Sequence, residues 1–221
     1  MANSRGPETI DADVLSTGAQ AVAAEEAVQD VDVIILSIPL NRVPDFAGVL
    51  AAAPADAVIV DTSNYYLARD DRVAAIDSGQ VESHWVAETI GRPVVKAWNS
   101  IGSDSLVRKG APAGTPGRIA LPVAADDDAA RALAMTLVED TGFDGFDAGP
   151  LEKSWRQQPG APCYGTDLTR DELPAALAAA EAARLPVRRD LAVAAIAERV
   201  GDGSTNPDAD YGVRLSRALY M

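Results

Sequence analysis

Small polar residues follow four of the apolar runs in this chain, at the points where the runs end. Hydroxyl and amide side chains, together with the backbone N–H groups of the loops that carry them, can bind a ligand through hydrogen bonds. In an open parallel sheet, ligands bind outside the carboxyl ends of the strands. The same residue types also end strands that bind nothing, so the four loops indicate a binding site only when they are taken together. They cover residues 39–40, 62–66, 98–101 and 148–151.

A second candidate lies near the start of the chain, where Ser4 and Arg5 stand directly before a predicted helix that opens at Pro7. A guanidinium can bind a phosphate through two parallel hydrogen bonds, and a helix N-terminus adds free N–H groups. In a dinucleotide-binding fold, an arginine at this place accommodates the 2′-phosphate of NADP. The pattern favours NADP over NAD, and the alternative is a solvated start with an incidental arginine.

Other reactive residues have simpler structural explanations. His84 is the only histidine, and a solvated helix face explains it better than a metal site, which needs more ligands. The three aspartates at 126–128 precede a predicted helix and suit its N-cap. Cys163 has no histidine placed to activate it, and Lys96 is expected to extend from a strand end toward the ligand crevice. We therefore expect no metal site and assign no catalytic side chain.

Short runs rich in β-branched residues alternate with helical stretches along the chain. Runs that are apolar throughout suit strands buried on both faces of a parallel sheet. The alternation is typical of βαβ units and predicts an α/β fold with a mostly parallel sheet. Beyond residue 172 the chain is alanine-rich and helical, and Pro186 divides two helices. We expect strands at 32–38, 57–61, 94–97, 118–123 and 143–147, and helices opening at 7, covering 23–29, 43–52 and 81–90, running from 129 to near 142, and covering 211–220.

Composition excludes several classes of protein. The 221 residues carry 33 acidic and 19 basic side chains and a formal net charge of −14, which argues against binding to nucleic acid or anionic lipid. One cysteine excludes a disulfide framework and suits a reducing cytoplasm. No apolar run approaches the roughly 20 residues needed to cross a bilayer. We expect a cytoplasmic protein with a small-molecule partner and no membrane or nucleic-acid partner.

Five segments, taken in their order along the chain, resemble the NADP-dependent oxidoreductases related to coenzyme F-420 reductase. The matching stretches are NSR from Asn3, DVIILSIPL from Asp32, VVKAWNSI from Val94, LPVAADDDAA from Leu121 and FDAGPLEKSW from Phe146. The resemblance implies a Rossmann-like, doubly wound sheet with a helical C-terminal segment. It also implies hydride transfer between NADP(H) and a flavin-like or deazaflavin ring such as coenzyme F-420. In such enzymes the hydride passes directly between two rings, so the protein supplies proximity and orientation.

The resemblance also assigns cofactor contacts and a division of the chain. A dinucleotide-binding part is expected over residues 1–150, and a substrate-side loop with helices over 151–221. The contacts fall on Ser4 and Arg5 for the 2′-phosphate, on Ser37, Ile38 and Pro39 beside the ribose and nicotinamide, on Ala97 and Asn99 near the carboxamide, and on Gly149 and Pro150 beside the second ring.

The chain departs from this family at its start. The family opens with a strand, a G-x-G-x-x-G turn and a helix over about 30 residues, and this unit does not precede Asn3. We hypothesise an N-terminally shortened reductase in which the loss of a central strand exposes apolar faces and unpaired strand edges. The alternative function is a non-catalytic or truncated Rossmann-like protein that no longer binds a dinucleotide. Exposed sheet edges and alanine-rich helices are compatible with a homodimer.

Overall fold

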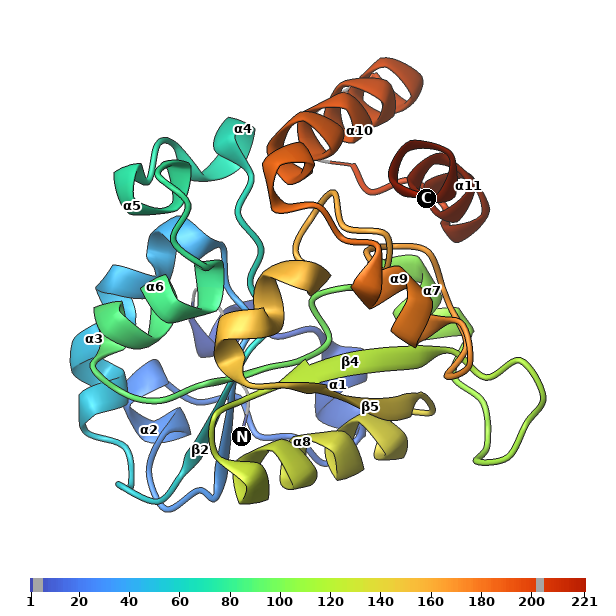
Figure 1. The fold of residues 1–221 in the computed structure, drawn as a ribbon. Helices are drawn as coiled ribbons and strands as arrows, with labels where there is room; N and C mark the ends of the chain where they lie inside the picture. The colour runs from blue at the N-terminus through green and yellow to red at the C-terminus, as the bar shows by residue number, and fades with distance from the viewer. Residues whose placement is uncertain (2–5, 202–204) are drawn as a thin grey trace.

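Five strands form one sheet in the computed structural model, which describes residue 1, residues 6–201 and residues 205–221. The first three strands in the sheet order run parallel, the fourth is antiparallel to the third, and the fifth is parallel to the fourth. Helices lie on both faces, so the fold is α/β and Rossmann-like (Figure 1). In sheet order the strands are β1 (Val33–Leu36), β2 (Val58–Asp61), β3 (Val95–Lys96), β4 (Ala120–Ala124) and β5 (Asp144–Gly149).

Helices and single turns connect the strands. The α-helices are α1 (Ala12–Ser16), α2 (Ala24–Ala27), α3 (Val43–Ala51), α4 (Leu67–Asp70), α5 (Ala74–Asp77), α6 (Glu82–Ile90), α7 (Ser103–Arg108), α8 (Asp128–Asp140), α9 (Leu173–Ala178), α10 (Leu185–Val200) and α11 (Ala209–Tyr220). The 3₁₀ segments are η1 (Pro7–Thr9), η2 (Leu40–Arg42), η3 (Leu151–Gln157) and η4 (Ala182–Arg184).

The central strands β2, β3 and β4 are buried almost throughout, as their sequences predict. Along β4, Leu121 and Val123 join the core under α8, whereas Ala120 and Ala124 join the core under α9. Small alanines therefore face the side where η3 and α9 pack closely, and larger residues fill the space beneath α8. Because successive side chains of a strand point to opposite faces, one short segment supports both layers.

Several helix boundaries follow from local chemistry that the sequence displays. α6 ends at Gly91, whose φ of 68° places it in the left-handed region that favours glycine. Asp127 caps α8, because its side chain accepts a hydrogen bond from the N–H of Ala130 at 2.7 Å. Pro186 lies in the first turn of α10, where its missing N–H costs no helical hydrogen bond.

The predicted helix at Pro7 is wrong in its length. Only the 3₁₀ turn η1 forms there, and the backbone returns to an extended conformation at Ile10. The helix proper, α1, begins after Asp11, whose side chain accepts a hydrogen bond from the N–H of Asp13 at 2.9 Å. A second N-cap close behind the proline therefore starts the helix later than the proline alone indicates.

The expectation that four strand ends share one crevice is also wrong. Leu36, Asp61, Lys96, Ala124 and Gly149 are Cα partners along one row across the five strands. Since β4 and β5 run opposite to β1–β3, the chain leaves Gly149 in the direction opposite to that in which it leaves Leu36, Asp61 and Lys96. Only the loops that follow β1, β2 and β3 leave the sheet in the same direction.

The C-terminal helices extend the fold on the η3 side. Leu173 and Leu177 of α9 share one core with Ala120 and Ala124 of β4, so residues on both sides of position 150 pack together. α10 and α11 lie against each other above this core (Figure 1). No helix in the described part of the chain is long and apolar enough to span a membrane.

Candidate functional site

A cleft of about 630 Å³ opens where β1, β2 and β3 end. Its volume falls in the range of small-molecule sites. The lining combines apolar side chains with hydroxyl, amide and indole groups, and none of the lining side chains is charged. The lining residues are Ile35, Ser37, Thr62, Asn64, Trp98, Asn99, Ile101, Ser103, Leu106 and Thr141.

β1 forms one wall of the cleft and is an end strand of the sheet. In the described residues it has β2 as its one strand neighbour, and the Ile35 side chain is 55% exposed. Val33 and Ile34 of β1 are partly buried and Leu36 is buried, so Ile35 is the exposed residue of this strand. It leaves an apolar surface beside the hydroxyl groups of Ser37 and Thr62.

Seven of the nine predicted contact residues fall into three groups. Ser37 and Asn99 line the cleft. Ala97 is fully buried in the core under α8, Ile38 packs on the opposite core, and Pro39 is exposed before η2. Ser4 and Arg5 lie outside the described residues.

Gly149 and Pro150 do not line this cleft. Gly149 closes β5, and its carbonyl accepts a hydrogen bond from the N–H of Ala125 at 3.1 Å. The antiparallel step between β3 and β4 carries both residues away from the edge where Ser37 and Asn99 lie. They are therefore separate from this cleft, and their place beside the second ring stays a prediction.

The side-chain amide of Asn99 forms its hydrogen bonds with groups inside the protein. Its Nδ2 donates to Asn64 Oδ1 at 3.0 Å and to the Gln157 carbonyl at 2.8 Å, which uses both amide hydrogens. Its Oδ1 accepts from Gln157 Nε2 at 3.0 Å. Asn99 is 3% exposed, so it supports the cleft rather than presenting a free amide to it.

Asn64 is a cleft residue that the assigned contacts omitted. Its Nδ2 donates to the Asn99 carbonyl at 2.9 Å, and its second amide hydrogen has no protein partner among the described residues. The sequence held a signal, since Asn64 follows the second predicted strand. The pairing of Asn64 with Asn99 joins the loops after β2 and β3.

A buried ion pair lies beneath these loops, on the face of the sheet that α6 covers. Lys96 Nζ is 2.9 Å from Asp61 Oδ2, and both side chains have 0% exposure. Lys96 also donates to the Ser63 carbonyl. Asp61 accepts from the N–H and Oγ of Ser63 at 2.8 and 2.6 Å, and from Ser83 Oγ at 3.0 Å. The expectation that Lys96 extends into the crevice is wrong, because the buried carboxylate holds it inside.

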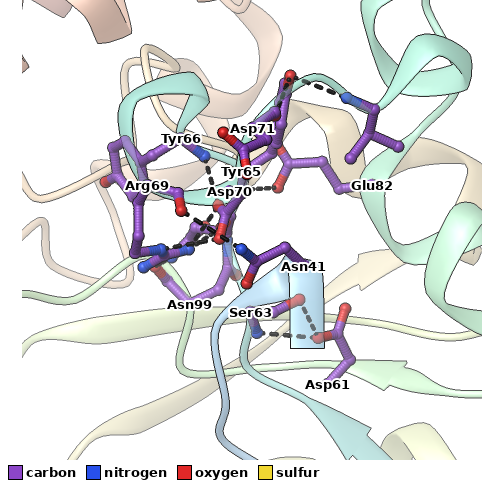
Figure 2. A network of polar contacts seen from close by, with 12 residues as sticks. Asn41, Asp61, Ser63, Tyr65, Tyr66, Arg69, Asp70, Asp71, Glu82 and Asn99 are labelled. Atoms are coloured by element: carbon purple, nitrogen blue, oxygen red, sulfur yellow. Dashed lines mark hydrogen bonds and ion pairs between the residues drawn. The ribbon is translucent and has the colours of Figure 1, made fainter. Parts of the chain in front are cut away.

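The chain beyond Asn64 is held by a second polar network (Figure 2). Glu82 Oε2 accepts from the Tyr65 N–H at 3.1 Å. Burial raises the pKa of Glu82 to about 7, against the opposing influence of Lys96. Tyr66 donates its N–H to buried Asp70, whose carboxylate also accepts two hydrogen bonds from Arg69 at 2.9 and 2.8 Å.

Paired hydroxyl groups tie this loop to the C-terminal part of the chain. The hydroxyl oxygens of Tyr66 and Tyr164 are 2.6 Å apart. Burial raises the pKa of Tyr66 to about 12, so both groups are protonated at neutral pH. Arg189 of α10 lies 5.2 Å from the ring centroid of Tyr65, which adds a cation–π contact. The loop after β2 is therefore anchored on two sides.

The surroundings of Cys163 disfavour a role as a nucleophile. Cys163 is buried, its Sγ lies 3.2 Å from the Arg156 carbonyl, and burial raises its pKa to about 12, which disfavours the reactive thiolate. Within the described ranges, no group of three or more histidine, cysteine or acidic side chains could hold a metal ion.

Comparison with known proteins bears on the part of the chain that contains β1 and β2. Residues 1–65 match the family described as NADP oxidoreductase, coenzyme F-420-dependent. This match confirms the resemblance for the segment that supplies Ile35, Ser37, Thr62 and Asn64 to the cleft. The match does not reach Trp98 or the segments that follow it.

One curated relative and two solved structures are similar to this chain. The Escherichia coli protein YjhV is 52% identical over 56 residues, which is 25% of this chain and 41% of YjhV. A hypothetical protein from Sinorhizobium meliloti has 27% identity and a TM-score of 0.64, over 76% of this chain and 82% of that one. A candidate F-420-dependent NADP reductase from an Arthrobacter species has 18% identity and a TM-score of 0.48, over 86% and 74%.

Proposed function

We propose that this protein is an oxidoreductase that transfers a hydride between NADP(H) and a flavin-like or deazaflavin ring. The observation that carries the proposal is the cleft at the ends of β1–β3, because four of its lining residues lie in the segment that matches the reductase family. The reaction balances as NADPH, a proton and the oxidised ring giving NADP⁺ and the dihydro ring.

The lining suits the ring end of a dinucleotide. Uncharged hydroxyl and amide groups beside apolar walls fit a carboxamide-bearing ring and ribose hydroxyls. No cationic side chain lines the cleft in the described residues, so the phosphates must be bound beyond it. We assign the 2′-phosphate to Ser4 and Arg5, the ribose side to Ser37 and the carboxamide side to Asn64.

Catalysis in this proposal rests on position. Asn99 and Gln157 fix the loops after β2 and β3 by hydrogen bonds of 2.8–3.0 Å, and the Asp61–Lys96 pair supports the same loops from below. The bound coenzyme supplies the hydride. The protein holds the two rings face to face and excludes water between them. No side-chain acid or base is required for hydride transfer itself.

Coenzyme titration tests the proposal. The Kd values for NADPH and NADH are measured by calorimetry, and NADPH oxidation is followed with riboflavin, FMN and coenzyme F-420 as acceptors. We expect NADPH to bind more tightly than NADH, and Arg5→Ala to remove about tenfold or more of that preference. Arg42→Ala is the matched control, since the Arg42 side chain is exposed and pairs with Asp45. Absence of NADPH binding by the wild-type protein refutes the function.

A non-catalytic role is the second candidate. It is favoured by the state of Asn99, whose amide hydrogens are both used inside the protein. A cooperatively unfolding protein whose melting temperature is unchanged by NADPH supports this alternative, because a ligand that binds only the native state must stabilise it.

A further inference from the structure

We propose that Trp98 is the stacking platform of the cleft and selects an uncharged planar heteroaromatic ring, presented by the nicotinamide end of the coenzyme or by its hydride partner. The inference rests on the proposed function and names the ring contact within the same site. Trp98 lines the cleft and also packs in part against the core under α8. It therefore stands between the packed interior and the open site.

The backbone of Trp98 is held in a conformation that tryptophan rarely adopts. Its φ is +55°, in the left-handed region, which is sterically unfavourable for an L-residue with a side chain. Such a conformation persists only where neighbours enforce it, and it is enriched at ligand clamps. Here the enforcing neighbours are on both sides: the Ala97 N–H donates to the Asp61 carbonyl at 3.3 Å, and Asn99 is bound by Asn64 and Gln157.

The indole is fixed at one edge. Trp98 Nε1 donates to Thr141 Oγ1 at 3.1 Å, and Thr141 Oγ1 donates in turn to the Val138 carbonyl at 2.7 Å at the end of α8. This chain of hydrogen bonds sets the plane of the ring before a ligand arrives. A rigid aromatic wall loses little conformational entropy on binding, so it can favour a ligand of matching shape.

The other walls define what can lie against the indole. Ile35, Ile101 and Leu106 add apolar surface, and Ile35 and Leu106 are 55% and 38% exposed. A phosphate or carboxylate would lack a cationic partner among the lining residues. A flat, uncharged ring instead buries apolar area and gains the offset-stacked geometry that aromatic pairs prefer.

The test compares ligands that do and do not carry a ring for this wall. Wild type, Trp98→Leu and Trp98→Phe are titrated by calorimetry with riboflavin, NADPH and 2′-phospho-ADP-ribose, which keeps the coenzyme phosphates but lacks nicotinamide. We expect Trp98→Leu to weaken riboflavin, NADPH or both about tenfold, with 2′-phospho-ADP-ribose unchanged and Trp98→Phe restoring most of the affinity. Trp155→Phe, outside the cleft lining, is the control and should change none of the three.

The outcomes separate this inference from the function on which it rests. Equal losses for all three ligands, or no loss for either ring ligand, overturn the stacking role even if NADPH is oxidised normally. If wild type binds neither NADPH nor 2′-phospho-ADP-ribose, the proposed function fails, and the riboflavin measurement still decides the role of Trp98. If the wild type then also shows no affinity for riboflavin, both the proposed function and the stacking role of Trp98 are overturned. If Trp98→Leu does not fold, Thr141→Val replaces it, with a loss of about threefold expected for ring ligands only.

Discussion

Breaking the buried Asp61–Lys96 pair from either side should have unequal consequences. We expect Asp61→Asn to destabilise the fold by about 3–5 kcal/mol, the usual cost of leaving one charge of a buried pair uncompensated. We expect Lys96→Met to cost less, about 1–3 kcal/mol. The two side chains are equally buried, at 0% exposure, so a difference must come from their remaining partners.

The remaining partners differ because the donors in this network surround the carboxylate. After Lys96→Met, Asp61 still accepts from the Ser63 N–H, the Ser63 hydroxyl and the Ser83 hydroxyl, at 2.8, 2.6 and 3.0 Å. Hydrogen bonds of this kind stabilise the charged form of a carboxyl group. After Asp61→Asn, the Lys96 ammonium keeps the Ser63 carbonyl as a hydrogen-bond acceptor.

Glu82 adds a pH dependence to this asymmetry. Lys96 lowers the pKa of Glu82 and Asp61 raises it, so Glu82 is sensitive to both members of the pair. When Asp61→Asn removes the competing negative charge, an ionised Glu82 can partly compensate Lys96. The cost of Asp61→Asn should therefore be smaller at pH 8 than at pH 6.

Urea unfolding followed by far-UV circular dichroism measures these free energies, with the single variants and the double variant compared at both pH values. The double variant should cost less than the sum of the singles, because neither partner is then left charged and alone. An equal or larger loss for Lys96→Met than for Asp61→Asn would refute the reasoning. It would mean that the three donors do not sustain an unpaired carboxylate.

Three further predictions concern stability. The pKa of Glu82 is raised to about 7 from a usual 4.5, so the folded state binds a proton more tightly than the unfolded state. The free energy of unfolding should therefore fall by about 3 kcal/mol as pH rises from below 4.5 to above 7. The urea midpoints of Glu82→Gln should not show this pH dependence. Arg92 donates hydrogen bonds of 2.9–3.5 Å to the carbonyls of Leu50, Ala53, Pro54, Ala55 and Ala57. Arg92→Lys should therefore lower the stability measured in a thermal melt by about 2 kcal/mol. Arg72→Lys, at an exposed ion pair, should change the stability little. A Cβ at Gly160 would lie 2.3 Å from the Leu185 carbonyl oxygen, so Gly160→Ala should lower the free energy of unfolding by about 3 kcal/mol. Gly114 also has a positive φ but open space around it, so Gly114→Ala should cost much less. Equal losses for the two variants would mean that the backbone angle alone causes the effect.

Local patterns determined most of the secondary structure. The apolar runs became β1 to β5 within a few residues, and Gly91, Asp127 and Pro186 set helix ends through backbone preferences that act within one turn. The same patterns placed Ser37 and Asn99 at the edge where the cleft opens. These features depend on interactions between residues close together in the chain.

Pairing between distant segments decided the rest. A strand buried on both faces has the same apolar sequence whichever way it runs, so Ala120–Ala124 gave no sign that β4 is antiparallel to β3 and that Gly149 points away from the cleft. Nor could the spacing show that Gln157, 58 residues along the chain, would occupy the amide of Asn99. Local patterns along the chain show which residues stand at strand ends. Which of their polar groups are already bonded depends on the folded arrangement, because hydrogen-bond capacity is limited and distant partners compete for it.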